Sequence, residues 1–123
     1  MKILVVEDDE FLTKIYKMTL NQEGHSVTTT KDGYEGLKAL KENKPDIILL
    51  DLLLPQKDGF EFLKEVKEDK KFKNIPVLIL TNLGQESDVK KAKALGADDY
   101  IIKANVEIED VIKKVNKYGK KKK

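Results

Sequence analysis

Four short, continuous apolar runs constrain the fold of this 123-residue chain more than any other feature. Each run is unbroken rather than alternating with polar residues, as expected of parallel strands that are buried on both faces. The runs are Ile3–Val6, Ile47–Leu50, Val77–Leu80 and Tyr100–Ile102. A fifth segment, Ser26–Thr30, is polar and rich in threonine, which suits a strand at the edge of a sheet.

Between these runs, apolar residues recur three or four positions apart, which predicts five amphipathic helices. The residues on the five apolar faces are Phe11, Leu12, Ile15 and Met18; Tyr34, Leu37 and Leu40; Phe62, Leu63 and Val66; Val89, Ala92 and Leu95; and Ile108, Val111, Ile112 and Val115. Two pairs have the spacing of a helix N-cap answered three residues later, Asp32 with Glu35 and Asp58 with Glu61. Gly24 and Gly96 stand where a left-handed helix C-cap favours glycine.

The order strand–helix, repeated five times, predicts the α/β class with crossover connections and helices on both faces of the sheet. We expect a doubly wound, five-stranded parallel sheet flanked by five helices, as in flavodoxin-like folds. The strand order 2-1-3-4-5 places the polar second strand on an edge.

The charge balance argues against a nucleic-acid-binding domain. The chain has 24 basic residues, all lysine, and 22 acidic ones, but four of the lysines are Lys120–Lys123. Without them, 20 basic residues face 22 acidic ones. We therefore predict one domain over residues 1–118, a solvated, disordered Lys-rich tail over 119–123, and no direct binding to nucleic acid. The absence of cysteine excludes disulfides and Cys-based metal sites.

No apolar stretch approaches the roughly 20 residues that a membrane span needs. The first strand follows Met1 and Lys2 directly, without the pattern of a signal peptide. We expect a soluble, cytoplasmic domain that does not bind membranes.

Residues with chemical potential follow four of the five predicted strands, at the sheet edge where open parallel sheets bind ligands. They are Glu7, Asp8 and Asp9 after the first strand, Asp51 after the third, Thr81 after the fourth and Lys103 after the fifth. The first and third strands are neighbours in the predicted order, so their carboxylates should crowd together and attract a hard cation such as Mg²⁺. An ammonium and a hydroxyl beside them suit a phosphoryl group, and a carboxylate can accept one.

Each of these residues alone has an ordinary explanation. Asp8 or Asp9 could cap the first helix, and a single aspartate after a strand is often a turn residue. Most lysines are solvated. The joint pattern at four strand ends is what favours a phosphoryl site.

With these motifs in their order and spacing, the chain resembles the receiver domain of two-component response regulators, of the chemotaxis-regulator type, over its whole folded length. The matching segments are Ile3–Asp9, Asp51–Pro55 with Asp58 and Gly59, Leu80–Thr81, and Gly96–Lys103.

The resemblance implies that Asp51 accepts a phosphoryl group with the help of Mg²⁺. By the same resemblance, Asp8 would bind the ion directly, Glu7 through a water molecule and Leu53 through its backbone carbonyl, with Asp51 as a further ligand. Lys103 would bind the phosphoryl oxygens. Such a domain catalyses only its own phosphorylation and dephosphorylation.

The resemblance also implies a conformational switch. Thr81 would be drawn to the phosphoryl group and Tyr100 would move inward, while Pro55 and Gly59 shape the loop beside the site. The implied partners are a sensor histidine kinase or phosphotransfer protein, and an unknown effector protein or output domain. The output face would comprise the fourth and fifth helices and the strand at Tyr100.

Two positions depart from the family pattern. Ala104 stands where the family has a proline joined by a cis bond to the site lysine. A cis bond to alanine would cost about 2.5–4 kcal/mol, so we predict a trans peptide and a rearranged loop before the fifth helix. Asn82 stands where a small residue is common and could alter access to Asp51.

Three other interpretations compete with this one. A phosphohydrolase would carry a second acid two residues after the nucleophile, where this chain has Leu53. A flavodoxin-like cofactor domain would need a hydroxyl- or glycine-rich phosphate loop in place of Glu7–Asp9. A passive interaction module would not require the complete set of acidic, hydroxyl and ammonium residues found at the four strand ends. We expect His25, the only histidine, at the surface and at the opposite end of the sheet.

Overall fold

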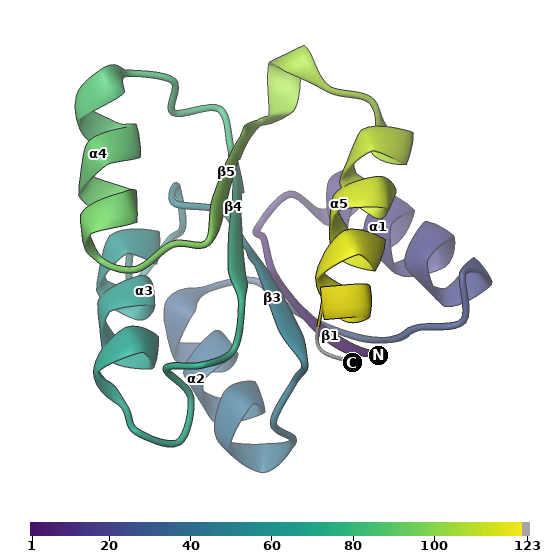
Figure 1. Cartoon of the computed structure of the whole chain (residues 1–123), viewed down its shortest axis with the longest axis horizontal. Coiled ribbons are helices and arrows are strands. Elements are labelled where there is room, and N and C mark those ends of the chain that lie inside the picture. Colours follow the sequence, from purple (N-terminus) through teal and green to yellow (C-terminus); the bar gives the residue numbers. More distant parts are fainter. Residues whose placement is uncertain (122–123) are drawn as a thin grey trace.

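Five parallel strands form one sheet in the order β2-β1-β3-β4-β5, as predicted (Figure 1). A computed structural model describes residues 1–121 of the chain, with side chains through residue 119. The strands are β1 (Lys2–Val6), β2 (Ser26–Thr30), β3 (Ile47–Leu50), β4 (Val77–Thr81) and β5 (Asp99–Ile102). In register, Val6 pairs with both Thr30 and Leu50, so the carboxyl ends of these strands lie level.

Helices alternate with the strands throughout the described residues. They are α1 (Glu10–Gln22), α2 (Gly33–Glu42), α3 (Gly59–Glu68), α4 (Glu86–Ala94) and α5 (Ile108–Lys121), with a short 3₁₀ helix η1 (Lys103–Asn105) before α5. Because α5 runs to Lys121, it includes part of the segment 119–123 expected to be a tail. Lys122 and Lys123 lie outside the described residues, and the domain boundary at 118 stays a prediction.

The sheet is covered on both faces (Figure 1). Alternate residues of the central strands point to opposite sides, so one face packs against α2, α3 and α4 and the other against α1 and α5. In β1, for example, Leu4 and Val6 join the first core, whereas Ile3 and Val5 join the second. The unbroken apolar runs are explained by this double burial.

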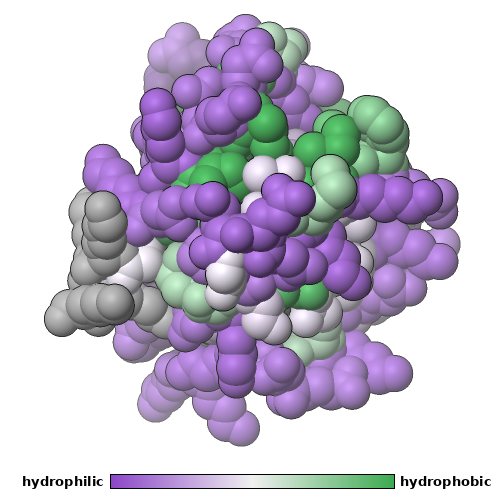
Figure 2. Space-filling model, turned by 90° about the vertical axis from the view of Figure 1, so that its right-hand side faces the viewer, coloured by the Kyte–Doolittle hydropathy of each residue, from purple (hydrophilic) through white to green (hydrophobic). Residues whose placement is uncertain are grey.

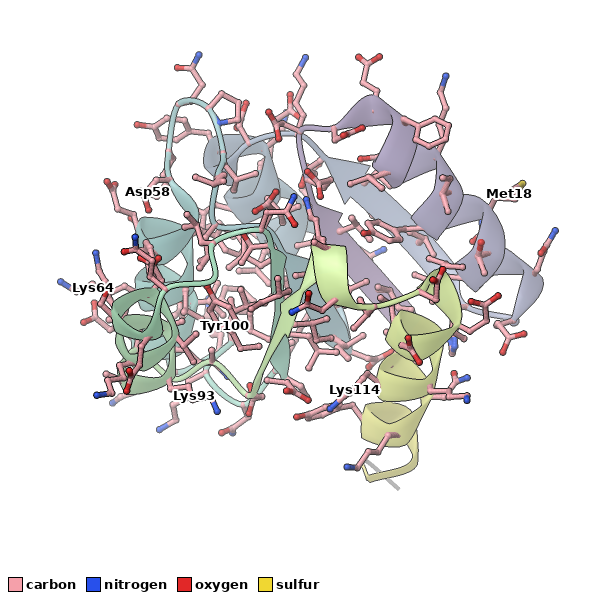
Figure 3. The ribbon with its side chains drawn as sticks, turned by 90° about the horizontal axis from the view of Figure 1, so that it is seen from above. Met18, Asp58, Lys64, Lys93, Tyr100 and Lys114 are labelled. Carbon is pink, nitrogen blue, oxygen red and sulfur yellow. The ribbon has the colours of Figure 1, made fainter. Side chains whose placement is uncertain are left out.

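The buried face of α1 agrees only in part with the one expected, where Leu12 packs against the core. Phe11 and Met18 are 71% and 58% exposed, and the residues that enter the core are Tyr16 and Leu20. Met18 points out from the helix, away from the sheet (Figure 3). Apolar spacing alone could not find this face because α1 carries apolar residues on two sides. Tyr34 of α2, also expected on an apolar face, is 62% exposed.

The predicted helix ends are confirmed. Asp32 accepts a hydrogen bond from the Glu35 amide, and Asp58 accepts bonds from the amides of Phe60 and Glu61. Of the two candidates before α1, Asp9 is the cap, since it accepts from the Phe11 and Leu12 amides. Gly24 and Gly96 have φ angles of 91° and 106° after α1 and α4, a conformation that is strained for residues with a Cβ.

The connection between β5 and α5 contains Ala104, one of the two departures from the family pattern. No peptide bond among the described residues is cis, so Lys103 and Ala104 are joined by a trans bond. Both residues belong to η1, which connects β5 to the segment before α5. The expected trans bond is therefore confirmed.

His25 lies at the opposite end of the sheet from Asp51, as expected, but it is not a free surface residue. It is partly buried, with Nδ1 3.1 Å from the Met1 amine and Nε2 2.9 Å from Asn116 Oδ1. These contacts tie the start of β2 to α5.

No helix in the part of the chain that the structure describes is both long and apolar enough to cross a membrane.

Candidate phosphoacceptor site

The carboxyl ends of β1, β3 and β4 bring the candidate residues together. Glu7, Asp51 and Thr81 are 3%, 6% and 0% exposed, whereas Asp8 is exposed. Glu7, Asp8 and Asp51 each offer a carboxylate oxygen, and these oxygens lie within 4.8 Å of one another. The predicted crowding of carboxylates from β1 and β3 is therefore present.

Lys103 faces these carboxylates from the end of β5. Its ammonium donates to Asp51 Oδ2 at 2.8 Å and also to Glu7 Oε1. The lysine side chain is only 12% exposed, so the contacts are shielded from water. One ammonium thus bridges two buried carboxylates, a contact with Glu7 that the sequence did not predict.

Backbone groups fix the position of Asp51. The Asp51 amide donates to the Val6 carbonyl at 3.0 Å, which continues the pairing of β1 and β3 into the site. The Leu53 amide donates to Asp51 Oδ1 at 3.0 Å. Gly59 closes the loop: a Cβ built there would lie 2.5 Å from the Asp51 carbonyl oxygen. Only glycine allows α3 to begin this close to the aspartate.

The electrostatics of the site follow from burial and charge. Burial raises the pKa of Glu7 from 4.5 to about 7, with a smaller rise from the charge of Asp51, while the hydrogen bond from Lys103 opposes the shift. Burial alone would lower the pKa of Lys103, but its hydrogen bonds to Asp51 and Glu7 outweigh this and the pKa is raised. The ammonium is therefore held charged, and negative charge is in excess.

Thr81 and Tyr100 each form a hydrogen bond with the backbone of Leu83. The Leu83 amide donates to Thr81 Oγ1 at 3.4 Å, and the Tyr100 hydroxyl donates to the Leu83 carbonyl at 2.5 Å. Tyr100 is partly buried between β5 and α4 (Figure 3). The two predicted switch residues therefore contact the same residue of the β4–α4 loop.

The donor set fits a hard divalent cation. All three candidate side-chain ligands are carboxylates, and the group contains neither histidine nor cysteine. Negative charge exceeds the single ammonium of Lys103 among these four residues. An additional cation would restore the balance.

The remaining candidates lie around this group. Leu53, where a phosphohydrolase would carry its second acid, is 53% exposed, and Asn82 is exposed beside Thr81. Tyr16, which the sequence did not single out, is buried on the α1 side of Lys103 and is electrostatically coupled to it. No spacing rule could have placed Tyr16 near Lys103.

The family model that describes the response regulator receiver domain matches residues 3–116 of this chain. The chain belongs to this family. It is a receiver domain of two-component signal transduction, a phosphoacceptor signalling module rather than a conventional enzyme. The resemblance suggested by the motifs is confirmed over almost the whole chain.

Curated relatives support this assignment. The chain is 41% identical to the alkaline phosphatase synthesis transcriptional regulatory protein PhoP of Bacillus subtilis, over 83% of this chain and 42% of that protein. It is 35% identical to protein PilH of Pseudomonas aeruginosa, over 94% of each. Thus this receiver domain spans less than half of some relatives and nearly the full length of another.

Solved structures agree. The receiver domain of the Francisella response regulator 1452 superposes with a TM-score of 0.90 at 31% identity, covering 99% of this chain and 98% of that one. The Mn²⁺-bound form of response regulator Rcp1 superposes with a TM-score of 0.81 at 32% identity, covering 93% and 88%. One solved relative of this receiver domain is therefore a metal-bound form.

Proposed function

We propose that Asp51 accepts a phosphoryl group from a phosphohistidine of a sensor histidine kinase or phosphotransfer protein. The observation that carries the proposal is the setting of this carboxylate. It is 6% exposed, held by the Leu53 amide and the Lys103 ammonium, and beside two further carboxylates at the ligand-binding edge of the sheet.

In the transfer step, an Asp51 carboxylate oxygen forms a bond to phosphorus as the bond from phosphorus to the donor's imidazole nitrogen breaks. The imidazole keeps the bonding electron pair and is released. With acetyl phosphate as the donor, the breaking bond is from phosphorus to the bridging oxygen and acetate leaves with the bonding electron pair. The Lys103 ammonium is positioned to neutralise charge on one phosphoryl oxygen. The Thr81 hydroxyl can donate a hydrogen bond to a second phosphoryl oxygen.

The residues that would hold Mg²⁺ are Glu7, Asp8 and Asp51, with the backbone carbonyl of Leu53 implied by the family resemblance. A bound cation of this kind supplies positive charge that offsets both the crowded carboxylates and the transferred group. Glu7 and Asp8 serve as anionic ligands whose position is fixed by the end of β1.

The backbone of Leu83 can couple a movement of Thr81 to a movement of Tyr100. If the Thr81 hydroxyl turns toward a phosphoryl oxygen on Asp51, its weak contact with the Leu83 amide is lost. The loop that carries Leu83 then moves, and the bond from the Tyr100 hydroxyl to the Leu83 carbonyl moves with it. Phosphorylation would shift the population between two arrangements of this loop and Tyr100.

The output face is proposed to comprise α4, β5 and α5, around Tyr100. There, Lys114 of α5 pairs with Asp99 of β5 at 3.0 Å, so the two elements are linked beside the switch residue. A histidine kinase partner and the carboxylate site together suggest a cytoplasmic domain.

Intact mass spectrometry after incubation with acetyl phosphate and Mg²⁺ tests the proposal. We expect one phosphate adduct that requires the metal and is absent from Asp51→Asn. Asp58→Asn is the matched control because it alters an aspartate of the same loop, and asparagine still caps a helix. It should be phosphorylated as the unaltered chain is.

A receiver that accepts only from its kinase would give no adduct with acetyl phosphate. Beryllium fluoride, an analogue of the phosphoryl group, should then still raise the thermal midpoint in a Mg²⁺-dependent manner. A chain that responds to neither reagent would have an inactive site, and the passive-module interpretation would replace the proposal.

A further inference from the structure

A cavity of about 240 Å³ lies behind Lys103, between α1 and the connection from β5 to α5. Leu12, Ile15 and Tyr16 form its α1 wall, and Lys103 and Val106 lie on the other side. Figure 2 faces the α1 and α5 side of the molecule and shows apolar surface framed by hydrophilic side chains. The lysine therefore has carboxylates in front of it and a largely apolar space behind it.

Tyr16 is the polar member of the α1 wall. Its side chain is 5% exposed, yet its hydroxyl takes part in none of the hydrogen bonds found among the described residues. No fully buried side-chain oxygen or nitrogen of these residues lacks a partner. The hydroxyl must therefore keep contact with solvent, and the cavity that Tyr16 shares with Lys103 is the space available to it.

The Tyr16 hydroxyl is electrostatically coupled to the site. Burial raises the pKa of Tyr16 to about 12. The charge of Lys103 lowers this pKa, and the charges of Glu7 and Asp51 raise it. The phenol thus stays neutral at physiological pH, and its oxygen can act as a dipole toward the ammonium.

We propose that Tyr16 is a positioning residue that holds the Lys103 ammonium forward over Asp51, by walling the cavity into which the lysine could retract. The inference rests on the proposed function. Before phosphorylation, Asp51 and Glu7 attract the ammonium. Once the Asp51 oxygen is bonded to phosphorus, this attraction changes, and the wall behind the lysine limits its withdrawal. Ala104 gives the following loop no rigid ring that could do the same.

The first test is the limiting rate of phosphorylation by acetyl phosphate, separated from the donor concentration at half-maximal rate. Tyr16→Phe keeps the ring and removes the dipole, and Tyr16→Leu also removes part of the wall. We expect the limiting rate to fall about threefold and about tenfold, respectively, with little change in the half-saturating concentration. Tyr118→Phe is the matched control, since it removes a tyrosine hydroxyl at the far end of α5, where that hydroxyl donates to the Asp98 carbonyl at 3.0 Å.

The second test reads the lysine directly and does not need phosphorylation. In ¹⁵N-lysine-labelled protein, the side-chain signal of Lys103 is assigned by its loss in Lys103→Arg. We expect this signal to shift in both Tyr16 variants and to stay in place in Tyr118→Phe. A purely structural role for Tyr16 would alter stability without moving this signal selectively.

The two tests separate the inference from the proposed function. An unmoved Lys103 signal, or a Tyr16→Leu protein with an unaltered limiting rate, would overturn the positioning role. A chain that takes no phosphoryl group from any donor would overturn the proposed function, and the Lys103 signal would still decide whether Tyr16 orients the lysine.

Discussion

Two lysines with the same side-chain exposure of 12% lie at opposite ends of the sheet. Lys67 of α3 donates to the carbonyls of Lys73 and Ile75 at 3.2 and 2.9 Å, and to Asp98 Oδ2 at 2.9 Å. Lys103 instead donates to two carboxylates, Glu7 and Asp51.

The difference lies in charge balance. All three ammonium donors of Lys67 can be satisfied by its three acceptors, and a single carboxylate that is 37% exposed matches its charge. Around Lys103, one ammonium faces the acidic group of Glu7, Asp8 and Asp51. The far end of the sheet is therefore a closed structural network. The site end carries unmatched negative charge, which a cation can neutralise.

Replacing each lysine by methionine tests this comparison most strongly. We expect Lys103→Met to lower the phosphorylation rate about 100-fold or more, the scale found when a preorganised charge is removed from a reacting group. Lys67→Met should leave the rate within about twofold. Equal rate losses in the two variants would contradict the division between a functional and a structural lysine.

The same substitution at Lys67 should reduce stability. Removing its ammonium leaves two carbonyls without this donor and Asp98 with the Val77 amide but no paired charge. This should lower the free energy of unfolding by about 2–3 kcal/mol. Urea denaturation measures this loss, and Lys64→Met, on the exposed face of the same helix, is the control. A loss as small as that of the control would show that the network contributes no stability.

Glu7 should give the site end a distinct pH dependence. The pKa of this carboxyl is raised from 4.5 to about 7 in the folded chain. Its protonated form therefore favours the folded state. That contribution to the free energy of unfolding is complete below pH 4.5 and is lost as the pH rises through about 7. The expected loss is of order 3 kcal/mol, since one pKa unit corresponds to about 1.4 kcal/mol. Glu7→Gln should flatten this part of the stability curve, and Glu10→Gln should not. An unaltered slope in Glu7→Gln would rule out this carboxyl as its source.

Divalent cations should stabilise the site end by a smaller amount. At a Mg²⁺ concentration ten times its dissociation constant, binding adds about 1.4 kcal/mol to the free energy of unfolding. The shift in thermal midpoint should shrink in Asp8→Asn and persist in Asp98→Asn, at the opposite end of the sheet. An equal shift in both variants would indicate non-specific binding.

The sequence predicted the parts of the molecule that depend on local pattern and topology. Unbroken apolar runs located β1, β3, β4 and β5, and the strand order then placed Glu7 beside Asp51. Glycines and capping aspartates located helix ends because their conformations and side-chain bonds are local.

The sequence did not predict contacts that depend on which side of a helix is buried. Phe11 and Met18 were expected on the apolar face of α1, whereas Tyr16 and Leu20 are buried. Lys67 gave no signal because one lysine among 24 looks like any other until the chain returns past it at Asp98. The bridge from Lys103 to Glu7 depends on the exact course of the β5–α5 connection.

Chemical localisation of the phosphoryl group tests the central claim most directly. Borohydride reduces an aspartyl phosphate to homoserine, and peptide mass spectrometry then identifies the converted residue. After phosphorylation in the presence of Mg²⁺, we predict homoserine at position 51 alone. Conversion at Asp8 or Asp9, or a phosphorylated chain with Asp51 intact, would contradict the account.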